Sequence, residues 1–366
     1  MNVKSTISKY AQEIDKEVAY YLKSELETSK HISPLIKELV KYVIDSIGTG
    51  GKRLRGIFVI SSYELFGGTD TKEIMKIAVY IEIIHAWLLV HDDIMDRADK
   101  RRGLDTIHEI YNKMYAHKFS KEEETRHFSN SVAICVGDIL SQLANKILLS
   151  SNFSDDKKTL ALKYASRQLT NVAYGQVMDL FCDISEVDEE YVKTVYKYKT
   201  GEYTYETPLF LGAIFAGIKD MEDIKPLKEY SLHGGIAYQI IDDIIDLFSD
   251  YEKTGKQPGR DIMEGKKTLL ITKAIEQAEP KSKATLKKYL GKSNLSHSEI
   301  ELCKSIIEET GSLDYSKRLA KDLLELSSSK LASQIHIKQE KVLDFLIGLN
   351  KYMHSRIYEE DNNFSS

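Results

Sequence analysis

The sequence of 366 residues is poor in proline and cysteine. It contains only 5 prolines, and short β-branched runs do not alternate with clusters of turn residues. This composition argues against an all-β fold and favours an all-α one. The 3 cysteines, Cys135, Cys182 and Cys303, lie in apolar helical contexts without metal-ligand spacing, so we expect buried, reduced thiols.

Targeting and linker segments are also missing. The first residues contain no apolar leader, and no stretch approaches the roughly 18 apolar residues of a membrane-spanning helix. We therefore expect no signal peptide, no membrane span and a cytoplasmic protein. No Gly/Ser-rich or Pro-rich linker divides the chain, so a single domain over residues 1–366 is expected. The net charge of −5 argues against a nucleic-acid surface.

An acidic stretch, IEIIHAWLLVHDDIMDRADKRRG, occupies residues 81–103. His85, Leu89, Asp92 and Asp96 recur at spacings of four, three and four residues, which places them on one face of a helix. With Asp93 beside them, three carboxylates crowd one helix end, and this is costly unless a cation lies among them. A ligand set made only of oxygen suits Mg²⁺, which takes further ligands from water and substrate phosphate.

Basic residues follow this first acidic motif. Arg101 and Arg102 precede Gly103, and guanidinium groups bind phosphate oxygens in pairs. Metal-holding acids next to phosphate-holding arginines indicate a diphosphate substrate. The alternative is a solvated acidic face, which is common in a chain of which 29% is charged.

A second acidic motif lies within residues 234–268, GGIAYQIIDDIIDLFSDYEKTGKQPGRDIMEGKKT. Gln239, Asp242 and Asp246 are again three and four residues apart, with Asp243 alongside, on an otherwise apolar helix. Carboxylates on so apolar a helix are unlike a random surface. Two lysines follow this motif, as the arginines follow the first: Lys256 and Lys266.

Three weaker signals lie in the first two thirds of the chain. The segment GGKRLR at Gly50–Arg55 can bind an anion, because a helix N-terminus and basic side chains are positive there, although it could be a plain connection. Gln176 and Asp179 share a helix face, either as a site or as a surface polar pair. Gly201, in a predicted helix, suggests a local break that brings neighbouring groups to a ligand.

Together these segments resemble the trans-isoprenyl diphosphate synthases (polyprenyl synthetases), most of all the short-chain geranylgeranyl diphosphate synthases. The shared motifs follow the family's order: GGKRLR, HDDIMD with RRG, GQVMDL, KTG, and YQIIDDIID with DIMEGKKT. The resemblance implies one large all-α bundle around a deep central cavity, and a homodimer. It also implies Mg²⁺-dependent condensation of isopentenyl diphosphate with an allylic diphosphate (dimethylallyl, geranyl or farnesyl). We expect a motif-bearing core at about 48–268, a helical wall and lid at 269–357, and a frayed tail at 358–366.

The resemblance further implies roles for individual residues. About three Mg²⁺ ions, for which Mn²⁺ can substitute, would bind Asp92, Asp96 and Asp242. Isopentenyl diphosphate would bind Gly51, Lys52, Arg55, His85 and Arg102. The allylic diphosphate would bind Arg101, Lys199, Thr200, Gln239, Lys256 and Lys266. Catalysis, by neutralising the leaving diphosphate, would rest on Asp92, Asp96, Lys199 and Asp242. A surrounding set would support the metal cluster: Asp93, Gln176, Asp179, Asp243 and Asp246.

Product length is expected to depend on residues before the first acidic motif. In the family, the fourth and fifth residues before this motif form the floor of the pocket that receives the growing chain. Here these residues are Leu88 and Trp87, and Ile84 lies one turn further down. A large residue only at the fifth position resembles the C20 producers, with farnesyl (C15) or longer products as alternatives. Trp87 lies about 140° from Asp92 on the helical wheel, so it could instead pack against a neighbouring helix.

Two other functions remain open. A class I terpene cyclase needs one acidic motif and has no use for the GGKRLR segment. A catalytically silent partner subunit would be expected to have lost an acidic motif, and neither is lost here.

Overall fold

The computed structural model describes residues 2–47, 51–182, 184–248, 259–292, 294–334 and 339–357. The described chain is helical apart from one two-stranded hairpin, which confirms the predicted all-α class. Three parts of the predictions lie outside the described residues: Gly50, Lys256 and the tail 358–366.

The elements through the first acidic motif and its hairpin are α1 (Val3–Ser29), α2 (Pro34–Ile47), α3 (Leu54–Leu65), α4 (Thr71–Met95), β1 (Lys100–Arg101) and β2 (Leu104–Asp105). The middle of the chain forms α5 (Ile107–Tyr115), η1 (Ala116–Lys118), α6 (Glu122–Leu149), α7 (Asp155–Cys182), α8 (Glu189–Val195), η2 (Tyr196–Glu206) and α9 (Thr207–Ala216). The remainder forms η3 (Met221–Ile224), α10 (Lys225–Phe248), α12 (Arg260–Glu264), α13 (Leu269–Gln277), α14 (Pro280–Tyr289), α15 (His297–Glu309), α16 (Ser312–Gln334) and α17 (Glu340–Ser355).

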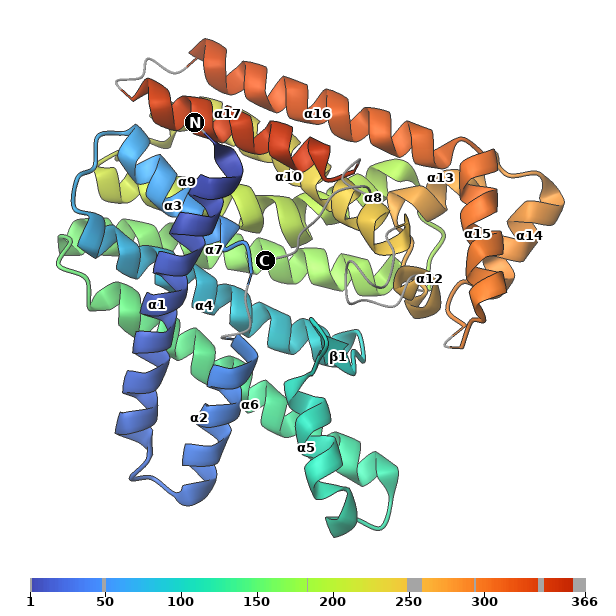
Figure 1. Cartoon of the computed structure of the whole chain (residues 1–366), viewed down its shortest axis with the longest axis horizontal. Coiled ribbons are helices and arrows are strands. Elements are labelled where there is room, and N and C mark those ends of the chain that lie inside the picture. Colours follow the sequence, from blue (N-terminus) through green and yellow to red (C-terminus); the bar gives the residue numbers. More distant parts are fainter. Residues whose placement is uncertain are drawn as a thin grey trace.

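Helices α4 and α10, which carry the two acidic motifs, run through the middle of the bundle (Figure 1). α4 packs against α1, α3, α6 and α9, while α10 packs against η2, α16 and α17. α4 is apolar around most of its circumference, with Ile77, Ile81 and Ile84 all buried, and such a helix is stable only when other helices surround it. The polar end of α4 is its C-terminal end, where the first acidic motif begins.

Glycines let the motif-bearing helices approach one another closely. A Cβ atom at Gly175 of α7 would lie 2.3 Å from the backbone nitrogen of Lys199 in η2. One at Gly235 of α10 would lie 2.5 Å from the Cα atom of Gly201. The expected helix break at Gly201 is wrong, because the helix continues through η2 in π-helical form. A Cβ atom at Gly201 would lie 3.4 Å from the carbonyl oxygen of Tyr196 and 3.5 Å from Gly235, which are ordinary contacts, so the close approach of η2 and α10 depends on Gly235.

Two composition-based expectations need correction. α4 and α6 are long and apolar enough to cross a membrane by length and composition alone, so the expectation that no stretch approaches this length is too strong. A core helix of a bundle passes the same test, and just over half of the apolar window of α4 is buried.

Cys182 and Cys303 are buried as predicted, and burial raises the pKa of Cys303 to about 11. Cys135 is exposed, so the prediction fails there.

Candidate functional site

The first acidic motif lies at the C-terminal end of α4, and Asp96 is its C-cap. The partial negative charge of a helix C-terminus disfavours carboxylates, so cations must offset the charge there. Two lysines do so: Lys199 Nζ lies 3.4 Å from Asp92 Oδ1, and Lys266 Nζ lies 2.8 Å from Asp96 Oδ2. Lys199 also lies 2.5 Å from Asp179 Oδ2. The structure therefore places both lysines, which the resemblance assigns to the allylic diphosphate, directly against acidic residues of the predicted metal site and its surroundings.

Burial and these ion pairs act in opposite directions on the charged groups. Burial would raise the pKa of Asp96, but Lys266 and Lys199 outweigh it and lower that pKa below its ordinary value. For Lys199, burial acts to lower the pKa, and Asp179 and Asp92 raise it above the usual range. Asp96 and Lys199 are therefore both charged at neutral pH.

Asp93 and Arg101 form a separate pair beside this cluster. Asp93 is 5% exposed, and Arg101 reaches its Oδ1 atom from Nε at 2.8 Å and from the guanidinium end at 2.7 Å. A longer contact of 3.4 Å joins Arg101 to Asp92. Burial raises the pKa of Asp93, and Arg101 opposes that shift. Arg101, predicted to bind the allylic diphosphate, is here engaged mainly with a carboxylate.

The second acidic motif lies in the last two turns of α10. Asp242 accepts a hydrogen bond from Arg356, which follows the end of α17, at 3.2 Å. The sequence analysis missed Arg356, because it lies 114 residues from Asp242 and in no recognisable motif. Asp246, one turn after Asp242, is half-buried.

Asp243, next to Asp242, is the end point of two hydrogen-bond chains. Its Oδ1 accepts from Gln239 at 2.7 Å, and Gln239 in turn accepts from the hydroxyl of Thr200 at 2.8 Å. Its Oδ2 accepts from the hydroxyl of Tyr196. Burial, and then the nearby carboxylate of Asp261, raise the pKa of Asp243. The predicted residues Thr200, Gln239 and Asp243 are therefore joined, and Tyr196 is a partner that the sequence analysis missed.

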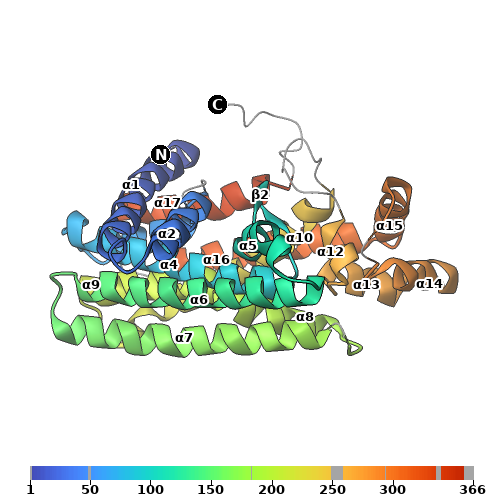
Figure 2. The same cartoon turned by 90° about the horizontal axis from the view of Figure 1, so that it is seen from below.

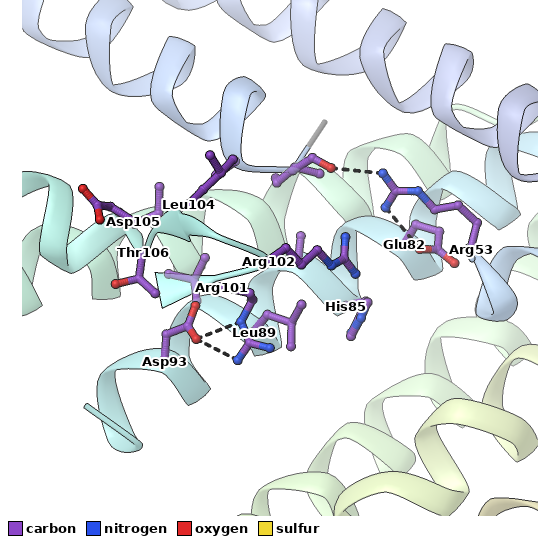
Figure 3. Close-up of a pocket in the computed structure, with 15 residues that line it drawn as sticks. Arg53, Glu82, His85, Leu89, Asp93, Arg101, Arg102, Leu104, Asp105 and Thr106 are labelled. Atoms are coloured by element: carbon purple, nitrogen blue, oxygen red, sulfur yellow. Dashed lines mark hydrogen bonds and ion pairs between the residues drawn. The ribbon is translucent and has the colours of Figure 1, made fainter. Parts of the chain in front are cut away.

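A positive region lies beside the first acidic motif, around a cavity of about 70 Å³ (Figure 3). His85, Arg101 and Arg102 line it together with Arg53 and Glu82. Burial, followed by the charges of the surrounding arginines, lowers the pKa of His85 well below its ordinary value, so the ring is neutral. Its buried Nδ1 atom has no hydrogen-bond partner among the described residues. A buried polar atom among arginines is the environment expected of an anion site.

The GGKRLR segment borders this region. A Cβ atom at Gly51 would lie 3.1 Å from the guanidinium of Arg102, so the glycine gives that group room. Arg55 stacks on the ring of Tyr203, with 4.4 Å between its Cζ atom and the ring centroid, and donates to Thr204 at 2.7 Å. Lys52 Nζ lies 5.5 Å from the centroid of the Tyr352 ring in α17. The structure thus places Gly51 beside Arg102, and brings Arg55 and His85 to the same Tyr203 ring, whose centroid lies 6.0 Å from that of His85. Lys52 contacts α17 instead.

Arg53, from the same segment, has a structural task. It is 7% exposed, has a left-handed φ of 46°, and donates to Asp15 at 2.6 Å and to the carbonyl of Ile47 at 3.0 Å. Buried Glu82 lies 3.4 Å from Arg53 and accepts from the backbone of Gly56 at 2.9 Å. These contacts tie the segment to α1, α2 and α4, and so fix the position of the neighbouring residues that are predicted to bind an anion.

The remaining predicted residues lie on α4 and α7. Ile84 is buried, while Trp87 and Leu88 are half-buried. Trp87 packs edge-on against His91, with 6.1 Å between ring centroids, and His91 lies 3.2 Å from the carbonyl of Ile134 in α6. Trp87 therefore lies on the side of α4 that faces α6. On α7, the amide nitrogen of Gln176 is buried without a hydrogen-bond partner among the described residues.

The arrangement suits a substrate with two charged regions. Within the described part of the chain, no three acidic, His or Cys side chains gather closely enough to form a metal site by themselves. Asp92, Asp96 and Asp242 instead each face a basic side chain from another element. Carboxylate oxygens are the kind of ligand that Mg²⁺ prefers, and the lysines next to them can turn to phosphate.

Comparisons with known proteins identify the family. The sequence model of the polyprenyl synthetase family matches residues 33–308. The short chain isoprenyl diphosphate synthase of Methanocaldococcus jannaschii is 32% identical over 305 residues, covering 83% of this chain and 85% of the relative. The geranylgeranyl diphosphate synthase of Saccharolobus solfataricus is 31% identical over 329 residues, covering 89% and 91%.

Among solved structures, the geranylgeranyl pyrophosphate synthase of Corynebacterium glutamicum, complexed with isoprenyl diphosphate and magnesium, superimposes with a TM-score of 0.88 at 28% identity. The match covers 95% of this chain and 99% of that one. The fold and the resemblance predicted from the sequence are confirmed. The roles of the individual site residues stay predictions.

Proposed function

Because the chain belongs to the polyprenyl synthetase family and is a prenyltransferase, we propose that it condenses isopentenyl diphosphate with an allylic diphosphate. The observation that carries this proposal is the presence of two separate regions of basic side chains. One surrounds His85 and Arg102, and the other consists of Lys199 and Lys266, which contact Asp92 and Asp96 of the first acidic motif. A terpene cyclase, which takes one diphosphate, has no use for the first region.

We assign isopentenyl diphosphate to the first region and the allylic diphosphate to the second. The unpartnered nitrogen atoms of His85 and Arg55 are donors or acceptors available to the first ligand. Lys199 and Lys266 would exchange their carboxylate contacts for contacts with the allylic diphosphate. Lys256 belongs to the same proposed set, although it lies outside the described residues.

The carboxylates of Asp92, Asp96 and Asp242 would hold Mg²⁺, about three ions in all, or Mn²⁺ in its place. When bound, the metal would supply positive charge for the leaving diphosphate. Asp93, Gln176, Asp179, Asp243 and Asp246 would support this cluster from around it.

The chain's own part in the reaction is to place charge and to exclude water. Lys199 and Lys266 stabilise the negative charge that develops as the allylic C1–O bond breaks. The double bond of isopentenyl diphosphate attacks the allylic carbon, and the proton lost afterwards passes to the released diphosphate. Apolar side chains around α4 protect the allylic cation from water.

We propose geranylgeranyl diphosphate (C20) as the main product. Trp87, the large residue five before the first acidic motif, would end the pocket for the growing chain, with Leu88 and Ile84 beside it. Farnesyl or longer polyprenyl diphosphates are the alternatives. In this proposal the chain is one domain, with the helices after residue 268 forming its wall and lid, and it works in the cytoplasm.

We further propose a homodimer formed through α6 and α7. Large apolar side chains are exposed on both helices, among them Ile134 at 47%, Tyr174 at 64% and Phe181 at 52%. α7 forms the outermost layer of the molecule, with α6 next to it (Figure 2). Exposed apolar surface of this kind marks association sites. The double substitution Tyr174→Glu and Phe181→Glu should halve the molar mass measured by sedimentation equilibrium, and an unchanged mass would place the contact elsewhere.

The central test uses labelled isopentenyl diphosphate with each allylic primer, followed by chromatographic sizing of the products. Asp92→Ala and Asp242→Ala should each lower turnover by orders of magnitude while leaving the helical circular dichroism intact. Asp322→Ala, which removes an exposed carboxylate in the middle of α16, is the matched control and should keep normal turnover. Near-normal turnover of either site variant in saturating Mg²⁺ would contradict a shared metal site.

A further inference from the structure

Tyr196 has no assigned role, yet its hydroxyl joins three of the segments that build the site. It is the first residue of η2 and is 6% exposed. The hydroxyl donates to Oδ2 of Asp243 in α10 and accepts from the backbone N–H of Leu269, the first residue of α13, at 2.7 Å. One buried oxygen atom therefore contacts both α10 and α13 from η2.

Each of these segments carries, or directly follows, a residue of the proposed allylic site. η2 carries Lys199 and Thr200, three and four residues after Tyr196. α10 carries Gln239 one turn before Asp243, and Lys266 lies shortly before Leu269. A change in the contacts of Tyr196 would therefore alter the relative positions of groups from all three.

The hydrogen bonds also have a defined direction. Leu269 donates to Tyr196, and Tyr196 donates to Asp243. From the other side, Thr200 donates to Gln239, and Gln239 donates to Asp243. Because the proton of the Thr200 hydroxyl is used for Gln239, the orientation of that hydroxyl is set by the same carboxylate that Tyr196 holds.

We propose that Tyr196 is a positioning residue for the prenyl transfer reaction, which holds Asp243, the Lys199–Thr200 segment and the start of α13 in one arrangement. The proposal rests on the proposed function, because it assumes that these segments bind the allylic diphosphate. A phenylalanine ring would fill the same space but would leave the Asp243 oxygen and the Leu269 N–H without this partner. Partners that orient a site's residues from outside typically affect activity by about 10–100-fold.

The test compares Tyr196→Phe with Tyr230→Phe. Tyr230 is also fully buried and donates its hydroxyl to the carbonyl of Leu346 at 2.9 Å, but it lies roughly 18 Å before Asp242 along α10. Both variants lose one buried hydroxyl, so both should melt at a lower temperature than the wild type. Only Tyr196→Phe should lower kcat by about 10–100-fold and raise KM for the allylic primer, with KM for isopentenyl diphosphate unchanged.

A second measurement does not depend on turnover. Hydrogen exchange followed by mass spectrometry should show faster exchange in the peptide that contains Leu269 in Tyr196→Phe, but not in Tyr230→Phe. If Tyr196→Phe does not fold, Tyr196→His takes its place. The imidazole keeps a donor and an acceptor in the buried site, but its side chain is shorter and should not hold both Asp243 and Leu269 as Tyr196 does. The same selective rise in the primer KM is expected of it.

The outcomes separate the two proposals. A wild type that condenses the substrates, with Tyr196→Phe matching Tyr230→Phe in its kinetic constants and exchange, would overturn the positioning role alone. An equal rise in both KM values would overturn it as well, because the role is specific to the allylic site. If the wild type forms no prenyl product, the proposed function is wrong and this inference falls with it.

Discussion

Trp87→Ala should lengthen the product. The indole lies on the face of α4 that points to α6, half-buried, and its buried N–H has no hydrogen-bond partner among the described residues. The substitution removes about nine ring atoms, whereas an isoprene unit adds about five carbons, so roughly one further unit should fit. We therefore expect the main product to shift from C20 to C25, with little change in the condensation rate.

The cost in stability should be moderate. Truncating a fully buried Trp costs about 3–5 kcal/mol, so for a half-buried one we expect roughly half of that. Products from labelled isopentenyl diphosphate and farnesyl diphosphate would be sized by reversed-phase chromatography, and folding checked by thermal unfolding. Trp87→Phe, which keeps an aromatic ring, is the matched control and should still stop at C20.

One result would refute this reasoning. If Trp87→Ala is folded and active but gives an unchanged product distribution, Trp87 only packs against α6. The floor would then lie elsewhere, most simply at Ile84, which is buried one turn further down α4. Ile84→Ala would in that case lengthen the product.

Two further predictions concern the charged residues. Lys52→Ala should raise KM for isopentenyl diphosphate far more than KM for the primer, and Lys199→Ala should do the reverse; steady-state kinetics showing equal effects in both variants would argue against two anion sites. Arg356→Met removes a cation that competes for Asp242, so it should lower by several-fold the Mg²⁺ concentration that gives half-maximal rate. An unchanged or higher concentration in a Mg²⁺ series would contradict that competition.

Local patterns in the sequence predicted the helices and the acidic motifs, because both depend on spacing within one element. The four-three-four spacing from His85 to Asp96 places these residues on α4, with Asp96 at its end. Tertiary partners were not predictable in this way. No spacing rule connects Tyr196 to Asp243, or distinguishes buried Arg53 from Lys52 and Arg55, its neighbours that are predicted to bind a ligand. Gly235 shows the same limit, because a Cβ atom there would lie 2.5 Å from the backbone of η2, a neighbour that the local sequence around Gly235 does not indicate.

The pairing of Arg356 with Asp242 has a consequence for how members of this family are recognised. The residues that match the family's sequence model end at 308, so the match stops before α17 begins. A chain shortened by a frameshift after residue 308 would keep every motif and the full match. It would nevertheless lack the cation that faces the second acidic motif, together with the Tyr352 ring beside Lys52. Gene surveys that rely on the matched region alone would count such a chain as an intact enzyme.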